Sequence, residues 1–183
     1  MILATLGPGG TCSEIVLGRH LSRFAPSASM RLYDSYEQAI EAVVAGDAAA
    51  AVIAAAYPRL NEFVMEVPRR VVIVDCFVAE TPALVLAGPA AMQVPELSGR
   101  GVACATATVP LARTKCPNSP VYLALSNAHA AQAVLAGIAD AAITTEPAAC
   151  AAGLEIFHSF GPLPMAWVVL QAVETKVTGD GLP

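Results

Sequence analysis

Two stretches of the chain repeat the same succession of a helix, a glycine and a strand. Positions 39–53 read AIEAVVAGDAAAAVI, and positions 130–144 read AAQAVLAGIADAAIT. Gly46 and Gly137 stand at equivalent places, where a glycine typically ends a helix. Each stretch completes a β-α-β-α-β order, which requires a parallel sheet with helices on its faces. We therefore predict an α/β protein of two lobes, with parallel-rich sheets flanked by helices and a cleft between the lobes.

Hydrophobic runs bounded by turn residues give the extents of the elements. Strands are predicted over 2–6, 30–33, 50–55, 71–86, 102–105, 121–125, 140–144 and 165–173, and helices over 15–24, 36–46, 58–65, 109–115 and 127–137. Pro82 breaks the run 71–86, because proline cannot sit in mid-sheet. We assign residues 1–87 and 161–173 to the first lobe and 88–160 to the second, and we expect 174–183 to be a flexible tail.

A glycine-rich turn joins the first predicted strand to the first helix. Thr11 and Glu14 have the spacing of a capping box, so Thr11 is the expected N-cap. Backbone N–H groups converge at such a turn beside the positive end of the helix dipole, and this arrangement binds carboxylate or phosphate. A plain βα turn, in which the glycines only satisfy backbone geometry, explains the spacing equally well. The loop matches neither the dinucleotide nor the P-loop pattern.

The composition excludes several classes of protein. The chain is 56% hydrophobic and 14% charged, which is typical of a globular domain, and no stretch is predicted to span a membrane. The first residues lack the basic segment and cleavage site of a signal peptide, so we expect a cytoplasmic protein. The net charge is −5, and Arg69-Arg70 is the only basic cluster, so nucleic acid is not an expected partner.

Five cysteines are scattered along the chain without a C-x-x-C pair. This pattern argues against a zinc site and a disulfide framework, and no residues have metal-ligand spacing. We predict neither a metal nor a cofactor. Cys12 is singled out because a thiol in the first turn of a helix can have a lowered pKa, although a packing role is the alternative.

Helix starts and short hydroxyl-bearing turns are expected to face the cleft, which suits a small carboxylate as ligand. A dicarboxylate can bridge the lobes with one anchor in each. The residues that we predict to bind such a substrate are Gly9, Gly10, Thr11, Cys12, Thr106, Thr108, Ser126 and Asn127.

Several motifs carry a resemblance to a known family. TLGPGGTCSE, the helix that begins DSYEQAIEA, LSNAHAAQAVLAGIADAAIT and EPAACAAGLEIF resemble the catalytic domain of prephenate dehydratases over nearly the whole chain. RLYDSYEQAIE, AYPRLNEFVM, ETP and FGPLPMAWVVL are more similar to the non-aromatising prephenate decarboxylases of the bacilysin pathway. The resemblance implies a two-lobed fold of the type II periplasmic-binding-protein kind and a place for Met165 and Trp167 in the substrate site.

The departures from the dehydratase pattern bear on the chemistry. Where dehydratases carry P-I-E-N-S this chain has residues 54–58, AAAYP, and where they carry T-R-F it has Met165 to Trp167. Both hydroxyl-bearing positions are lost. Loss of the ring hydroxyl as water needs a proton donor, so the usual dehydratase reaction is disfavoured. The decarboxylase pattern is also incomplete, since AAA replaces its P-H-A at residues 54–56 and ATA replaces its S-H-P at residues 105–107.

We therefore expect a cofactor-independent, non-aromatising decarboxylase acting on prephenate or a related small cyclic acid in secondary metabolism, such as antibiotic biosynthesis. Candidate proton donors are Tyr57, His129 and Glu80, each with an alternative role in packing or at the solvated surface. A dehydratase-like enzyme of altered chemistry and an inactive protein that binds a keto or aromatic acid remain the alternatives. The sequence leaves open whether the protein forms a homodimer. Because no regulatory module follows, feedback by phenylalanine is not expected.

Overall fold

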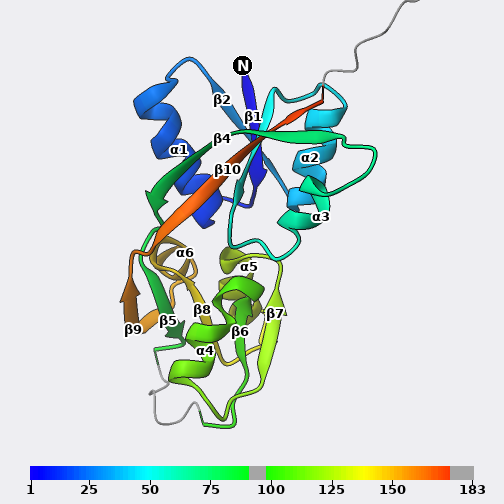
Figure 1. The fold of residues 1–183 in the computed structure, drawn as a ribbon. Helices are drawn as coiled ribbons and strands as arrows, with labels where there is room; N and C mark the ends of the chain where they lie inside the picture. The colour runs from blue at the N-terminus through cyan, green and yellow to red at the C-terminus, as the bar shows by residue number, and fades with distance from the viewer. Residues whose placement is uncertain (91–97, 174–183) are drawn as a thin grey trace, which may run out of the picture.

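The computed structural model describes residues 1–90 and 98–173 and folds into two lobes, one above the other in Figure 1. The first lobe contains Ile2–Leu6 (β1), Cys12–Phe24 (α1), Ser29–Tyr33 (β2), Tyr36–Val44 (α2), Ala50–Ala54 (β3), Leu60–Val64 (α3), Val71–Glu80 (β4) and Pro164–Ala172 (β10). The second contains Leu84–Gly88 (β5), Val102–Ala105 (β6), the 3-10 helix Thr106–Thr108 (η2), Val109–Lys115 (α4), Val121–Ala124 (β7), Asn127–Leu135 (α5), Ala141–Thr145 (β8), Glu146–Ala151 (α6) and Glu155–Gly161 (β9).

The two sheets share one plan, which confirms the predicted α/β architecture. The first has the strand order β2-β1-β3-β10-β4, and the second has β7-β6-β8-β5-β9. In each, the first three strands are parallel to one another and the remaining pairings are antiparallel. Gly46 and Gly137 follow α2 and α5 with φ of 82° and 70°, a left-handed conformation that glycine adopts without strain.

The crossing between the lobes differs from the predicted division at one strand. The predicted first lobe extends to residue 87, yet β5 pairs with β8 and β9 of the second sheet. The break at Pro82 therefore marks the crossing itself, because the chain leaves the first sheet there. The two crossing segments hold each other: the Thr81 N–H donates to the Leu163 carbonyl at 2.9 Å, and the Leu163 N–H donates to Thr81 Oγ1 at 3.0 Å. The predicted tail, 174–183, lies outside the described residues.

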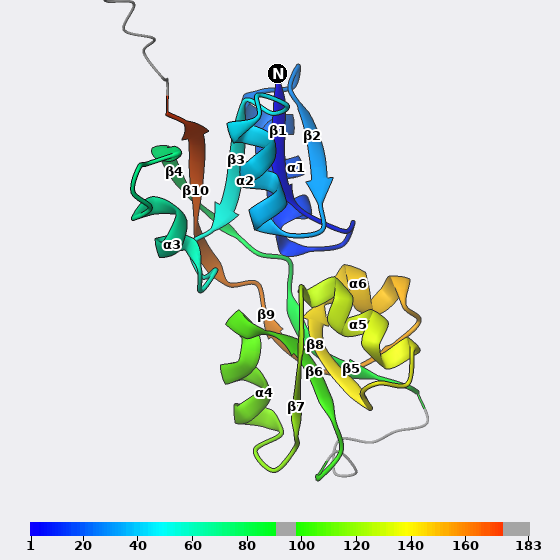
Figure 2. The ribbon, with the colours of Figure 1, turned by 90° about the vertical axis from the view of Figure 1, so that its right-hand side faces the viewer.

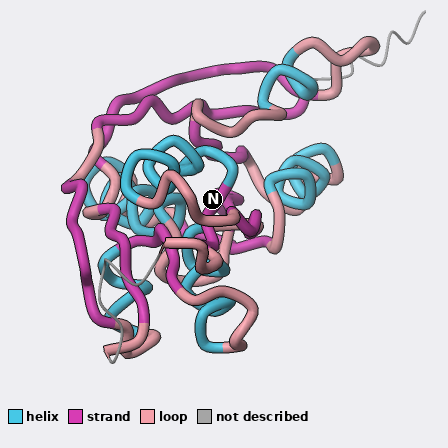
Figure 3. Tube along the Cα trace, turned by 90° about the horizontal axis from the view of Figure 1, so that it is seen from below, coloured by secondary structure: helices cyan, strands magenta, loops and turns pink. Residues whose placement is uncertain are grey.

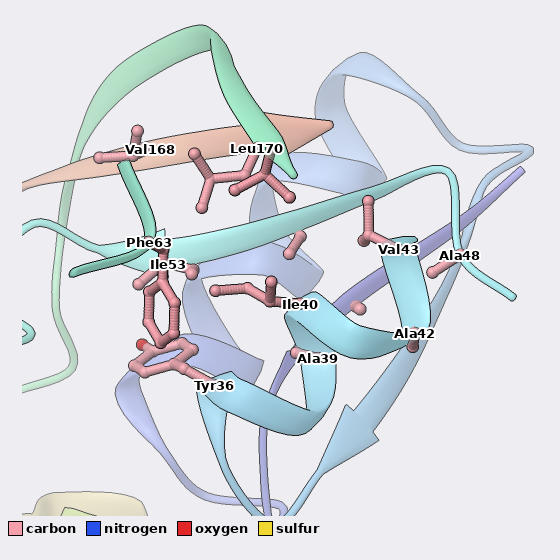
Figure 4. Packing of buried hydrophobic residues seen from close by; sticks show 13 residues of the cluster. Tyr36, Ala39, Ile40, Ala42, Val43, Ala48, Ile53, Phe63, Val168 and Leu170 are labelled. Carbon is pink, nitrogen blue, oxygen red and sulfur yellow. The ribbon is translucent and has the colours of Figure 1, made fainter. Parts of the chain in front are cut away.

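Helices cover both faces of the first sheet, as the side view and the view from below indicate (Figures 2 and 3). On one face, α2 packs Ile40 and Val43 against β3 and β10 (Figure 4). The ring of Tyr57 contacts that of Tyr36 edge-on and stacks on that of Phe63. On the other face, α1 packs Val16 and Leu17 against the fully buried Trp167. These contacts fix the start of α1, the start of α2 and the end of β3 next to one another.

No helix was predicted over Glu146–Ala151, where α6 follows β8 directly. Thr145 caps it by accepting a hydrogen bond from the Ala148 N–H at 3.2 Å. Among the described residues, no helix is both long enough and apolar enough to cross a membrane.

Candidate functional site

A pocket of about 120 Å³ lies where the two lobes meet. Of the residues predicted from the sequence, Thr11, Cys12, Tyr57, Thr106, Thr108, Ser126, Asn127, Met165 and Trp167 line it. The remaining lining residues, which the sequence reasoning did not select, are Leu6, Ser13, Tyr36, Ala54, Ala56, Pro58, Thr81, Leu84, Ala105, Ala107, Ala124 and Leu125.

The glycine turn contributes its helix start to this pocket, while Gly9 and Gly10 do not line it. Thr11 Oγ1 accepts from the Glu14 N–H at 3.1 Å, which confirms the predicted N-cap. The Glu14 carboxylate reaches back to the Gly10 N–H at 3.2 Å, so that amide is already engaged. The Gly10 carbonyl accepts from Thr145 Oγ1 at 2.7 Å and thereby ties the two lobes together. The N–H groups left without an intrahelical acceptor are those of Cys12 and Ser13.

Cys12 lies in the first turn of α1, where a lowered pKa was one expectation. The structure gives the opposite direction: burial raises the pKa of the thiol to about 11. The Asn127 Nδ2 group donates to the sulfur at 3.5 Å and acts to lower the pKa, but desolvation outweighs it. The side chain is therefore a neutral thiol at physiological pH, and it joins the two lobes through Asn127.

The start of α5 forms the facing wall of the pocket. Ser126 caps the helix by accepting from the His129 N–H at 3.2 Å, and its hydroxyl also lies 2.8 Å from His129 Nδ1. His129 is thus turned toward its own helix cap and does not line the pocket. Asn127 links the walls, because its Oδ1 accepts from Thr108 Oγ1 at 3.3 Å while its Nδ2 reaches Cys12.

Tyr57 lies at the pocket wall, but its hydroxyl proton is already used in a hydrogen bond. The hydroxyl donates to the Glu37 carboxylate at 2.5 Å, and that carboxylate also pairs with Arg59. Burial raises the pKa of Tyr57, and the neighbouring Glu37 carboxylate raises it further. Partial burial acts to raise the pKa of Glu37, yet the hydrogen bond from Tyr57 and the charge of Arg59 together lower it.

Glu80, the third candidate proton donor, is exposed at the end of β4 and lies away from this pocket. It lines a separate hollow of about 440 Å³ together with Arg19, His20 and Arg23 of α1. The structure therefore brings Tyr57 to the pocket between the lobes and leaves Glu80 and His129 outside it.

Ser13 and Tyr36 form a buried pair of hydroxyl groups that sequence reasoning missed. Ser13 Oγ lies 2.6 Å from Tyr36 Oη, which also accepts from the Ala54 N–H at 3.2 Å. Burial raises the pKa of Tyr36 to about 12. Ser13 is the second residue after the cap Thr11 in GTCSE, and Tyr36 is the first after the cap Ser35 in DSYE. This position in the first turn of a helix is the signal that could have indicated them.

The described residues that line the pocket include no aspartate, glutamate, lysine, arginine or histidine. The first turns of α1 and α5 both open toward it, and each carries N–H groups without intrahelical acceptors. Such ends favour negative charge through the helix dipole. Within the part of the chain that the structure describes, no group of acidic, cysteine and histidine side chains is arranged to hold a metal ion. The pocket can thus hold an anion by backbone N–H groups within a largely apolar wall.

Comparison with known proteins places the chain in a family. No family model matches it. A prephenate decarboxylase of Planktothrix agardhii is 30% identical over 180 residues, which cover 92% of this chain and 87% of that protein. The chain belongs to the prephenate decarboxylase family. This membership confirms the resemblance seen in the motifs, and it supports a lyase-type enzyme with a prephenate-related activity.

Solved structures confirm the fold. The prephenate dehydratase of Arthrobacter aurescens in complex with L-Phe superposes with a TM-score of 0.70 at 18% identity, over 93% of this chain and 60% of that one. The chain thus spans less than two thirds of that dehydratase. The periplasmic VFT2 domain of Bordetella pertussis BvgS gives a TM-score of 0.60 at 19% identity, over 94% of this chain and 80% of that one. The chain therefore shares its two-lobed, periplasmic-binding-protein-like fold with a dehydratase and with a periplasmic domain.

Proposed function

We propose that this protein is a cofactor-independent decarboxylase that acts on prephenate, or on a closely related cyclic acid, without making the ring aromatic. The observation that carries the proposal is the pocket between the lobes, where two helix N-termini open into walls without a charged side chain. A substrate with two carboxylates has one possible anchor in each lobe. The relative from Planktothrix agardhii, named as a prephenate decarboxylase, supports prephenate as the first substrate to test.

The apolar walls suit loss of carbon dioxide from a ring carboxylate. Met165 and Leu84 present only apolar atoms and a thioether, so a carboxylate that lies against them loses hydration without gaining a cation. Its charge disperses when the bond to the ring breaks, and the transition state is therefore less penalised by this environment than the ground state. A second carboxylate on the substrate side chain is then held by the N–H groups of a helix start.

The same walls argue against loss of the ring hydroxyl. Met165 stands where the dehydratase motif T-R-F has its threonine, and the neighbouring Trp167 directs its Nε1–H to the Ala79 carbonyl at 3.4 Å. Expulsion of the hydroxyl as water needs an acid within hydrogen-bond reach. Loss of carbon dioxide needs a proton at a ring carbon and none at the ring hydroxyl, so the hydroxyl is retained.

A protein that binds a keto or aromatic acid without turnover is the second candidate. The raised pKa values of Cys12, Tyr36 and Tyr57 favour it, because each group is a weak acid at neutral pH. A role in secondary metabolism, a cytoplasmic location and a homodimer stay proposals beside either function.

An NMR time course of the purified protein with prephenate, read against spontaneous decay, separates these functions. A decarboxylase yields carbon dioxide and a non-aromatic product that still carries its ring hydroxyl. Protein-dependent formation of phenylpyruvate would overturn the non-aromatising proposal. Saturable binding of prephenate by calorimetry without any protein-dependent turnover would favour the binding protein.

A further inference from the structure

We infer that the hydroxyl groups of Ser13 and Tyr36 act as one unit that supplies the proton taken up by a ring carbon when carbon dioxide leaves. The inference rests on the proposed decarboxylation and adds the residues that perform the proton transfer. It starts from the position of the pair: both side chains line the pocket and both are nearly inaccessible to solvent, at 3% and 4% exposed.

The hydrogen bonds of the pair leave one of its two hydroxyl protons without an acceptor. Each hydroxyl has one proton, and the contact between Ser13 Oγ and Tyr36 Oη uses one of the two. The Ala54 N–H donates to Tyr36 Oη, so that contact uses no hydroxyl proton. Within residues 1–90 and 98–173, neither oxygen has another acceptor. Whichever hydroxyl donates to the other, one proton therefore has no acceptor in the protein and is available to a molecule in the pocket.

Apart from Thr81, the other threonine hydroxyl protons around the pocket are already used or face water. Thr11 Oγ1 donates to the Leu6 carbonyl at 3.0 Å, and Thr108 Oγ1 donates to the Ala105 carbonyl at 3.0 Å. Thr106 is exposed, so water satisfies its hydroxyl. The Ser13–Tyr36 pair differs from these because it is buried and has a proton without an acceptor. Thr81 is also buried, and its Oγ1 accepts from the Leu163 N–H at 3.0 Å without donating to another described residue. The pair differs from Thr81 because it contains a phenol, which is a stronger acid than an aliphatic hydroxyl.

Burial raises the pKa of Tyr36 to about 12, and neighbouring groups offset part of this cost to the charge that remains after proton transfer. Ser13 lies in the first turn of α1, where the helix dipole favours an anion. An oxygen that has lost its proton keeps the hydrogen bond from the Ala54 N–H or gains one from the partner hydroxyl. A phenol is a stronger acid than an aliphatic alcohol, so Tyr36 is the ultimate source of the proton even where Ser13 is the group nearest the ring.

The reaction step balances with these groups alone. The bond between the ring and its carboxylate breaks, and carbon dioxide leaves. The electron pair of that bond moves through the diene, and a ring carbon takes one proton from the Ser13–Tyr36 pair. The pair is left with one negative charge, and water returns the proton after the product departs. No oxidant, reductant or metal takes part in this step.

The test compares the wild-type protein with Ser13→Ala, Tyr36→Phe and the double variant. Either single variant keeps one hydroxyl without an acceptor, whereas the double variant keeps none. We therefore expect each single variant to retain part of the prephenate-consuming activity and the double variant to lose at least about 100-fold in kcat, the usual range for a general acid. A double control, Ser22→Ala with Tyr122→Phe, removes the same atoms from an exposed site on α1 and an exposed site on β7, and should keep the wild-type kcat.

The reaction run in D2O gives a second measurement on the same proteins. A fixed donor places deuterium on one face of the ring carbon, so the wild-type product should carry a single configuration in its NMR spectrum. Either single variant should give a mixture, because its remaining hydroxyl has lost the hydrogen-bond partner that orients it and water competes from the open side. This measurement needs only the wild-type protein and the single variants. It therefore tests the role of the Ser13–Tyr36 pair even if circular dichroism shows that the double variant is unfolded.

The outcomes separate the inference from the function on which it rests. No turnover of prephenate by the wild-type protein would overturn both. Turnover by the wild-type protein together with an unchanged kcat in the folded double variant would overturn the Ser13–Tyr36 inference alone. Unchanged facial selectivity in both single variants would have the same effect.

Discussion

Replacement of Thr11 by alanine tests how the first helix start is held. The side chain is 2% exposed and makes two hydrogen bonds, one accepted from the Glu14 N–H and one donated to the Leu6 carbonyl. Loss of an N-cap costs about 1 kcal/mol, and the carbonyl left without its donor costs about 1 kcal/mol more. The missing methyl group adds up to about 0.8 kcal/mol. We expect Thr11→Ala to lower the free energy of unfolding by about 2 to 3 kcal/mol in total.

Two matched variants isolate these contributions. Thr11→Ser keeps both hydrogen bonds and loses only the methyl group, so it should cost about 0.8 kcal/mol or less. Ser35→Ala removes a single cap bond at the start of α2, from the Gln38 N–H at 3.2 Å, and should cost about 1 kcal/mol. If Thr11→Ala were no worse than Ser35→Ala, or Thr11→Ser as damaging as Thr11→Ala, the two-bond account of this residue would be refuted.

Urea unfolding followed by tryptophan fluorescence suits this comparison. The sequence contains one tryptophan, Trp167, and it packs against Val16 and Leu17 of the helix that Thr11 caps. The fluorescence therefore reports on the lobe in which the substitutions are made. Equal m-values across the variants are required before the midpoints are converted to free energies.

Three further predictions concern reactivity, pH and shape. At pH 8 a thiol reagent should label the exposed Cys76 and Cys150 first, and labelling of Cys12 should accelerate as the pH rises toward its pKa of about 11; early labelling of Cys12 would contradict its burial. Tyr57→Phe removes a hydrogen bond that lowers the pKa of Glu37 in the folded state, so its cost in unfolding free energy should be full above about pH 5 and should fade as the pH drops below about 4. A cost independent of pH would refute this. Small-angle scattering should show a smaller radius of gyration with saturating prephenate, since the anchors lie in different lobes; identical profiles would indicate a preformed cleft.

Local chemistry made the helix boundaries predictable from the sequence. Thr11 and Ser126 act as caps because a side-chain oxygen three residues before an N–H can reach it wherever the helix lies in the fold. Gly46 and Gly137 end their helices for an equally local reason, their positive φ. The short α6 was not predicted because its alanines give no amphipathic period, although the cap Thr145 and a proline in its first turn mark its start.

Long-range pairing explains what the sequence did not predict. The sequence of β5 is typical of a buried strand and fits either lobe. It joins the second sheet because it pairs with β8 and β9, which are far away in the chain. Ser13 and Tyr36 are 23 residues apart and meet only because α1 and α2 begin at the same edge of the first sheet. Tyr57 was selected from its position near the end of β3, but its bond to Glu37 depends on how α2 is rotated.

The order of β10 in the first sheet has a consequence for how the chain folds as it is synthesised. β10 lies between β3 and β4, so it completes a sheet whose other strands were made before the whole second lobe. Until residues 164–172 leave the ribosome, β3 and β4 have a gap between them, with the hydrogen-bonding edges that face it open to the solvent. The second lobe is formed by one continuous segment, from β5 to β9, and all of its strands are synthesised before β10. The middle of the chain is thus expected to fold first, and the first residues made are among the last to reach their final packing.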